Sequence, residues 1–118
     1  MSNQVRKMSQ RIAADETATK FAALGDRTRL ELLVKLGREG PQSIKQLSEG
    51  FSVTRQAITK HLHVLLAAEL VEERVSGREH RFGAKPQSLL DLRHSLDMIS
   101  QQWDDALARL QRFVEEND

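Results

Sequence analysis

The chain has 118 residues, of which 39% are hydrophobic and only five are aromatic, so we expect one domain with one appended element and a modest core. It contains no cysteine, which excludes disulfides, thiolate metal ligands and cysteine nucleophiles. No apolar run approaches the roughly 20 residues of a membrane span, and the amino terminus lacks the apolar core of a signal peptide. We therefore expect a soluble, cytoplasmic protein with no membrane contact.

The net charge is only +1, but the charges are unevenly distributed along the chain. Residues 1–85 contain 15 Lys and Arg against 10 Asp and Glu, whereas residues 86–118 contain 3 against 7. This asymmetry indicates that the first part faces a polyanion and that the acidic part lies away from it. Charge segregation of this size also arises by chance in small proteins, so it only supports the signals below.

Residues 1–14 are polar and are expected to form a flexible arm. Residues 17–24 fit a short helix with Phe21 and Leu24 on one side, ended by Gly25. Asp26 is placed to cap a second helix, from Arg27 to about residue 38. The side chains expected to be buried on this second helix are Leu30, Leu33, Val34 and Leu36.

The next segment has the form of a helix-turn-helix. Ser43 and Gln46 have the spacing of a capping box, which predicts a short third helix. Residues 50–53 then turn the chain before Thr54 caps a fourth helix that runs to about residue 68. In a helix-turn-helix with this spacing, the second helix enters the major groove of DNA.

The fourth helix has two different faces. Ile58, Leu62 and Leu65 recur at helical spacing and are expected to point inward. The opposite face carries side chains that can all hydrogen-bond outward: Arg55, Gln56, Thr59, Lys60 and His63. Arg and Gln can make paired hydrogen bonds to base edges, and Thr and Lys can bind phosphate oxygens. The alternative is an ordinary solvated helix face.

Residues 70–75 and 80–84 read as two strands around a turn that contains Gly77. Arg78, His80 and Arg81 lie at the tip and on the return strand, with Glu79 among them. A basic hairpin beside a helix-turn-helix is a wing that contacts phosphates or the minor groove. The alternative is a solvent-facing turn.

Pro86 begins a final helix expected to run to about residue 115. Its apolar residues alternate at spacings of three and four, which is a heptad seam: Leu89, Leu92, Leu96, Ile99, Trp103, Ala106, Leu110 and Phe113. A helix of about 30 residues spans roughly 45 Å, longer than so small a domain can cover. The seam therefore predicts a homodimer, with Phe21 and Leu24 packing beside it. The alternative is packing of the seam against its own domain.

With these elements in this order, the chain resembles the ArsR/SmtB family of small bacterial winged-helix repressors. The matching segments are residues 24–30, residues 54–65, Leu70 with Val71, and the wing tip at Gly77 and Arg78. The resemblance extends from about residue 18 to 86, and the tail around Trp103 is similar to a metal-independent branch often encoded beside lipid-binding-like START-domain proteins. It implies a homodimer on an inverted-repeat operator and, in many members, release by an effector.

The resemblance also assigns site residues. It places Thr54, Arg55, Gln56, Thr59, Lys60 and His61 on the recognition helix, and Arg78 and Arg81 on the wing. For His61, DNA contact and packing both remain open.

This chain departs from the family pattern at several positions. Ser43 and Lys45 stand where metal-sensing members have a Cys-x-Cys motif, and Asp91 and His94 are one residue too far apart for the Asp-x-His site. We therefore expect no metal and no cofactor. Glu69 stands where the family commonly has a glycine before Leu-Val, so the sequence does not predict at which residue the fourth helix ends.

The sequence thus predicts a mainly α protein (an α+β winged helix), with a DNA-binding unit over residues 15–85 and a dimerisation helix over residues 86–118. The expected function is a DNA-binding transcriptional regulator, a repressor. The alternative is a winged-helix module that uses its heptad helix to bind another protein without reading DNA. No enzymatic activity is expected, because the Ser, His and Asp residues lack the local context of a catalytic site.

Overall fold

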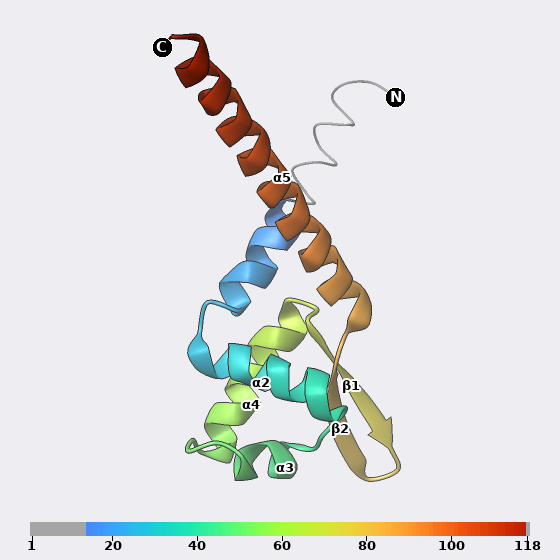
Figure 1. The fold of residues 1–118 in the computed structure, drawn as a ribbon. Helices are drawn as coiled ribbons and strands as arrows, with labels where there is room; N and C mark the ends of the chain where they lie inside the picture. The colour runs from blue at the N-terminus through green and yellow to red at the C-terminus, as the bar shows by residue number, and fades with distance from the viewer. Residues whose placement is uncertain (1–13, 118) are drawn as a thin grey trace, which may run out of the picture.

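The computed structural model describes residues 14–117, which form a winged helix-turn-helix with a long C-terminal helix (Figure 1). A first helix is described over residues 14–23. The elements that follow are α2 (Arg27–Glu39), α3 (Ile44–Glu49), α4 (Arg55–Ala67), β1 (Val71–Ser76), β2 (Glu79–Ala84) and α5 (Pro86–Glu116). The predicted mainly α fold and its order of elements are confirmed. The expected arm largely lies outside the described residues, but Ala14 is already helical.

Three helices begin at the capping residues that the sequence predicts. Asp26 accepts a hydrogen bond from the backbone N–H of Arg29 (3.0 Å), and Thr54 Oγ1 accepts one from Ala57 (3.1 Å). Ser43 and Gln46 form a complete capping box. Each cap pairs a backbone donor that the helix itself leaves unsatisfied, so short polar motifs fix where the helices start.

The core lies where α2, α3 and α4 meet the base of the hairpin. Its fully buried side chains are Leu32, Leu36, Leu47, Ile58, Leu62, Leu65 and Leu70. Burying each such leucine or isoleucine contributes about 1.5–3 kcal/mol relative to exposure. The expected inward face of α4 is confirmed, but that of α2 is partly wrong. Leu30 and Val34 are 46% and 44% exposed, and Leu32 takes the buried position instead.

The hairpin is a regular antiparallel pair that is also anchored to the domain. Its register pairs Val71 with Ala84 and Ser76 with Glu79, and Gly77 forms the turn with φ +62°, a conformation that favours glycine. An isolated bridge joins Phe82 of β2 to Gln42, through hydrogen bonds of 2.9 and 2.8 Å between their backbones. The wing is therefore held at its base by the segment that precedes α3.

The end of α4 is a Schellman motif with an unusual residue. Glu69 has φ +59°; its N–H donates to the Leu66 carbonyl, and the Leu70 N–H donates to the Leu65 carbonyl (3.0 Å each). This left-handed position strongly favours glycine. The helix therefore ends at Ala67 even though the glutamate carries a steric cost there.

Helix α5 is 31 residues long, about 46 Å, and extends away from the rest of the fold (Figure 1). Its first turns pack on the domain, where Leu92 is buried and the Ser88 hydroxyl donates to the Glu69 carbonyl. Beyond Leu92 the side chains of α5 are exposed, except that those of Ser95 and Ala106 are half-buried. None of the helices in the described part of the chain combines the length and apolar character that crossing a lipid bilayer requires.

Candidate nucleic-acid interface

The outward face of α4 brings five predicted side chains together. They line one open hollow on the surface: Arg55, Gln56, Thr59, Lys60 and His63. The opposite face of the same helix is anchored by Ile58, Leu62 and Leu65, each with no exposed surface. Because that apolar face is fixed in the core, the helix cannot rotate about its axis, and the five polar side chains keep their outward direction.

These side chains are chemically free to meet a ligand. Within residues 14–117, the side chains of Arg55, Gln56, Lys60 and His63 make no hydrogen bond or ion pair. Thr59 differs, because its hydroxyl donates to the Arg55 carbonyl (2.9 Å) and retains only its acceptor lone pairs. The surface therefore offers several unpaired donors along slightly more than two turns of helix.

The turn between α3 and α4 is braced by a contact that the sequence does not predict. The Lys35 ammonium of α2 lies 5.6 Å from the centre of the Phe51 ring, a cation–π distance. A Cβ added at Gly50 would meet the flexible end of the Lys35 side chain, which would then have to move. No local sequence signal announces the contact, because it joins residues brought together only by packing.

The wing holds its charges in local pairs. Arg74 lies 2.9 Å from Glu72, Arg81 2.7 Å from Glu79, and His80 2.6 Å from Glu73. Arg78, at the turn, is the one wing arginine without an ion-pair partner among residues 14–117. The wing is therefore less basic than its sequence indicates, and Arg81 must share its charge with a neighbouring carboxylate.

His61 points away from the outward hollow. Its ring is 23% exposed, and its Nδ1 atom lies 3.8 Å from Asp26 Oδ2 and 3.5 Å from a guanidinium nitrogen of Arg29. These partners lie at the start of α2, on the inner side of α4. Of the two roles left open by the sequence, this position favours packing.

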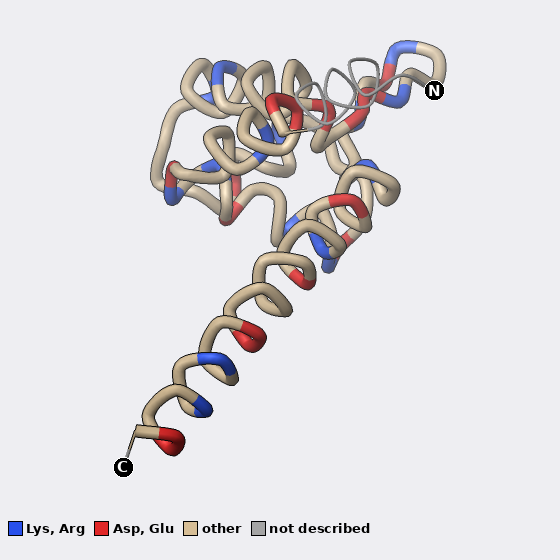
Figure 2. The backbone as a smooth tube through the Cα atoms, turned by 90° about the horizontal axis from the view of Figure 1, so that it is seen from above, with Lys and Arg blue, Asp and Glu red and all other residues tan. Residues whose placement is uncertain are grey.

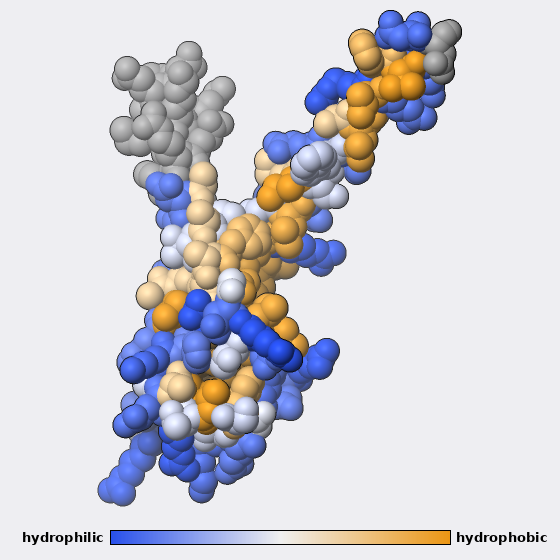
Figure 3. All heavy atoms as spheres, turned by 90° about the vertical axis from the view of Figure 1, so that its left-hand side faces the viewer, coloured by the Kyte–Doolittle hydropathy of each residue, from blue (hydrophilic) through white to orange (hydrophobic). Residues whose placement is uncertain are grey.

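The predicted dimer residues divide into two groups. Phe21, Leu24 and Leu89 are half-buried against the core and Leu92 is buried. The rest of the seam is exposed, by 46–65%, at Leu96, Ile99, Trp103, Leu110 and Phe113. Hydrophobic side chains follow the projecting part of α5 in Figure 3. A hollow lined by Phe21, Met98 and Ile99 separates this seam from the first helix.

The charges of the chain differ between α5 and the outward face of α4. Acidic residues recur along α5 (Figure 2), whereas the α4 hollow contains Arg55, Lys60 and His63 and no carboxylate. Among residues 14–117, no three His, Asp or Glu side chains come together in a way that could hold a metal ion. The cationic hollow therefore lies on the side of the molecule that suits a polyanion.

Comparison with known proteins supports the same assignment. A family profile described as "Helix-turn-helix domain" matches residues 24–74. The HTH-type transcriptional regulator Rv2034 of Mycobacterium tuberculosis is 32% identical over 95 residues, which cover 80% of this chain and 85% of the relative. The arsenical resistance operon repressor of Bacillus subtilis is 38% identical over 58 residues, covering 49% of this chain and 55% of the relative.

A solved structure adds a likeness of the whole fold. An ArsR-like transcriptional regulator from Rhodococcus sp. RHA1 is 42% identical and superposes with a TM-score of 0.76, covering 85% of this chain and 93% of that one. The overall fold of this chain therefore recurs in a protein whose sequence is 42% identical. This chain belongs to the ArsR family of winged helix-turn-helix, DNA-binding transcriptional regulators.

Proposed function

We propose that this protein represses transcription by binding an inverted-repeat operator as a homodimer. The observation that carries the proposal is the α4 hollow, in which Arg55, Gln56, Thr59, Lys60 and His63 face outward together. In this proposal, residues 15–85 form the DNA-binding unit and residues 86–118 the dimerisation helix. Family membership supports DNA binding.

The side chains of the hollow divide by chemistry into two roles. Arg55 and Gln56 lie in the first turn of α4, where a recognition helix meets base edges, and both can form paired hydrogen bonds there. Thr54 and Lys60 suit phosphate oxygens, Thr59 does so once its hydroxyl releases the Arg55 carbonyl, and His63 extends the same face. On the wing, Arg78 is the first candidate for a phosphate or minor-groove contact, and Arg81 follows once its pairing with Glu79 loosens.

The exposed seam of α5 supports the homodimer. Burying large apolar side chains such as Trp103 and Phe113, now 65% and 64% exposed, against a second copy would remove them from water. A two-fold dimer presents two α4 helices to successive major grooves, about 34–36 Å apart. The inverted repeat in the operator would then mirror the symmetry of the protein.

Repression is the regulatory direction that the relatives support. The Bacillus subtilis relative is named a repressor, and it matches this chain over 58 residues at 38% identity. Outside the winged helix, the described residues form the first helix and α5. The exposed apolar seam lies on α5. A dimer of this kind would act most directly by covering a promoter.

The test is to recover bound genomic fragments with the purified protein, sequence them, and footprint the enriched site. We expect an inverted repeat with half-sites one helical turn apart and a retarded band in gel shifts. If the dimer makes about 6–10 phosphate contacts, affinity should fall about 10³- to 10⁵-fold between 50 and 200 mM salt. A single half-site is the control, and we expect it to bind much more weakly. Binding without sequence enrichment, or without salt dependence, would contradict the proposal.

A further inference from the structure

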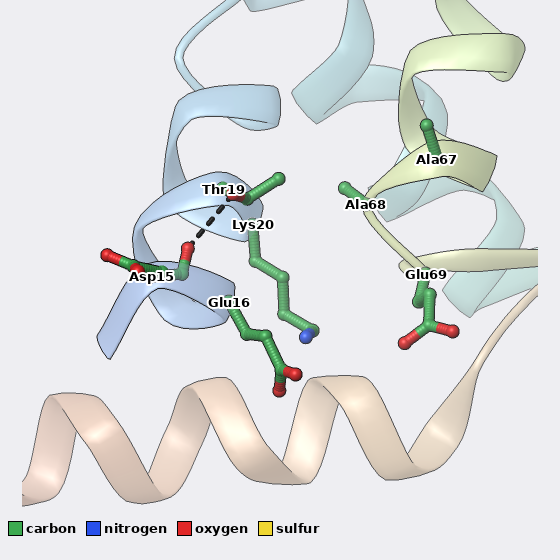
Figure 4. A pocket seen from close by; sticks show the side chains of 7 residues that line it. All are labelled: Asp15, Glu16, Thr19, Lys20, Ala67, Ala68 and Glu69. Carbon is green, nitrogen blue, oxygen red and sulfur yellow. Dashed lines mark hydrogen bonds between the residues drawn. The ribbon is translucent and has the colours of Figure 1, made fainter. Parts of the chain in front are cut away.

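The end of α4 and the start of α5 meet at a small joint that lies outside the DNA-facing hollow. The chain leaves α4 at Glu69, forms the wing, and begins α5 at Pro86. Figure 4 shows Glu69 directly after the end of α4, with its side chain directed toward α5. The Lys85 N–H donates to the Leu70 carbonyl (2.9 Å), which closes the base of the wing and brings the two helix ends together.

A side-chain hydrogen bond joins these two helix ends directly. The Ser88 hydroxyl, in the first turn of α5, donates to the main-chain carbonyl of Glu69. Ser88 is only 5% exposed, so water cannot easily take the place of either partner. Serine buries little apolar surface and is a weaker helix former than alanine, so the hydroxyl is what this residue contributes here.

The backbone at Glu69 makes the acceptor available. Its left-handed conformation, with φ +59°, turns the chain out of α4, and its carbonyl accepts from α5. The side chains at the joint add a weaker link, because Lys85 Nζ lies 3.9 Å from Glu69 Oε1 and both groups are exposed. Solvent screens an exposed pair of this kind, so it holds the two helices together only loosely.

The rest of the joint is apolar and small. Leu92 is buried and Leu89 is half-buried against the core, and beyond Leu92 helix α5 projects from the domain (Figure 1). Apolar contact has no preferred direction, whereas a hydrogen bond weakens steeply when its angle departs from linear. The Ser88 bond is therefore the contact best suited to fix the angle between α5 and α4.

That angle matters for the function proposed above, in which α4 meets a DNA half-site and α5 joins two copies of the chain. The angle then sets the separation of the two α4 helices in the dimer. Moving a half-site by one base pair displaces it by about 3.4 Å and rotates it by about 35°. We propose that Ser88 is a positioning residue, which sets the preferred half-site spacing by holding α5 at a fixed angle to α4. The spacing rests on the proposed dimeric DNA binding, whereas the fixed angle does not.

Distance measurements within one DNA-free chain test the fixed angle. Spin labels are attached through Val64→Cys on α4 and Arg109→Cys far along α5, both exposed positions in a chain that has no other cysteine. An excess of unlabelled protein restricts the measured distances to single chains. We expect Ser88→Ala to broaden or shift the distance distribution between the two labels. An unchanged distribution would overturn the proposal.

Ser95→Ala is the matched control for both measurements. Ser95 also lies on α5, but its hydroxyl donates to the Asp91 carbonyl of the same helix (3.1 Å) and does not cross the joint. We expect this variant to retain the distance distribution of the unmodified protein. An equal broadening in Ser95→Ala would assign the effect to α5 itself and would also overturn the proposal.

Operators that differ only in half-site spacing test the consequence for DNA binding. Gel shifts compare the recovered inverted repeat with versions in which the half-sites are one base pair closer or farther apart. We expect the unmodified protein and Ser95→Ala to lose about tenfold in affinity at either altered spacing, and Ser88→Ala to lose only about threefold or to prefer another spacing. Circular dichroism and the thermal midpoint establish that each variant is folded at the assay temperature.

The two measurements also separate the possible failures. A merely structural role of Ser88 would lower the thermal midpoint of Ser88→Ala but leave its spacing preference unchanged, and that result would overturn the positioning role. If the unmodified protein showed no preference for any spacing, the proposed binding to an inverted repeat would fail. The distance distributions would still decide whether Ser88 fixes the angle between the two helices.

Discussion

The Nδ1 atom of His61, in the middle of α4, lies 3.8 Å from the Asp26 carboxylate at the start of α2. A guanidinium nitrogen of Arg29 approaches the same ring nitrogen at 3.5 Å, and Arg29 Nε donates to the carbonyl of Ala23 in the first helix. One cluster of polar side chains thus connects the first helix, α2 and the recognition helix. It sets the position of α4 from the side opposite to its outward face.

Asp26 gives the fold an acid-sensitive contact. The hydrogen bond from the Arg29 backbone, assisted by the charges of Arg29 and His61, lowers the pKa of the Asp26 carboxyl below its usual range. Because the pKa is lowered in the folded state, the ionised Asp26 carboxylate contributes to folding stability. This stabilisation is fully present above the pKa of an unfolded aspartate, about 3.9, and is lost as the pH falls through the lower folded-state pKa. Urea unfolding between pH 7 and pH 2.5 should show a smaller acid loss for Asp26→Asn than for the unmodified protein.

The control for this measurement is Asp104→Asn, which changes an exposed carboxylate on α5. This variant should follow the unmodified protein across the whole pH range. Identical pH dependence of Asp26→Asn and the unmodified protein would show that the Asp26 contact does not contribute to folding stability.

Replacing Glu69 with glycine should stabilise the protein. Glu69 holds φ +59° at the end of α4, where a side chain with a Cβ costs about 1 kcal/mol relative to glycine. We expect Glu69→Gly to raise the free energy of unfolding by about that amount in urea titrations. Glu69→Ala is the control at the same position, because it removes the carboxylate but retains the Cβ. An equal gain from Glu69→Ala would assign the effect to the charge and not to the backbone.

The sequence predicts the starts of the helices well because the caps are local. Ser43 with Gln46, and Thr54, act within one turn of the chain, so no distant contact can move them far. The inward face of α2 could not be predicted in the same way. Leucines at positions 30, 32, 33 and 36 are compatible with more than one apolar stripe, and only packing against α4 selects the stripe that contains Leu32.

The site shows the same division between local and distant effects. The outward face of α4 follows from helical periodicity, and all five predicted side chains do line one hollow. The pairing of Arg81 with Glu79 and of His80 with Glu73 depends on the hairpin register and on side-chain rotamers, which composition does not reveal. The Lys35 contact with Phe51 and the burial of Lys20 depend on tertiary packing alone.

Gln56 and Lys60 should separate base reading from phosphate binding. Gln56→Ala removes a side chain that can pair with a base edge, so it should relax sequence preference at one base pair by about 1–3 kcal/mol. Lys60→Ala should weaken all DNA sequences alike and reduce the slope of log affinity against log salt by about one. Gel shifts on a set of single-base operator variants measure both effects.

Arg93→Ala, on α5, is the control for the DNA-binding measurements, and we expect unchanged affinity and salt slope. A sequence-independent loss in Gln56→Ala together with a sequence-dependent loss in Lys60→Ala would reverse the two assignments.

The wing should bind DNA more strongly when Glu79 is neutralised. Glu79 lies 2.7 Å from Arg81, and an exposed ion pair of this kind is worth only about 0–1 kcal/mol, so the arginine is readily released. Glu79→Gln should therefore raise affinity a few-fold and steepen the salt slope, whereas Arg78→Ala should lower both. Glu116→Gln, at the far end of α5, is the control for a general change in charge. Weaker binding by Glu79→Gln would show that the carboxylate is needed to position Arg81.

Trp103 reports directly on the proposed dimer. It is the only tryptophan in the chain and is 65% exposed, so burial against a second copy should shift its fluorescence to shorter wavelength. Dilution should reverse that shift as the dimer dissociates, and sedimentation should give the same midpoint concentration. Leu110→Ala, on the seam and 58% exposed, should weaken dimerisation at least about tenfold. Leu90→Ala, similarly exposed at 56% but off the seam, should leave it unchanged. Equal effects of the two leucine variants, or an emission maximum independent of concentration, would argue against the heptad seam as the interface.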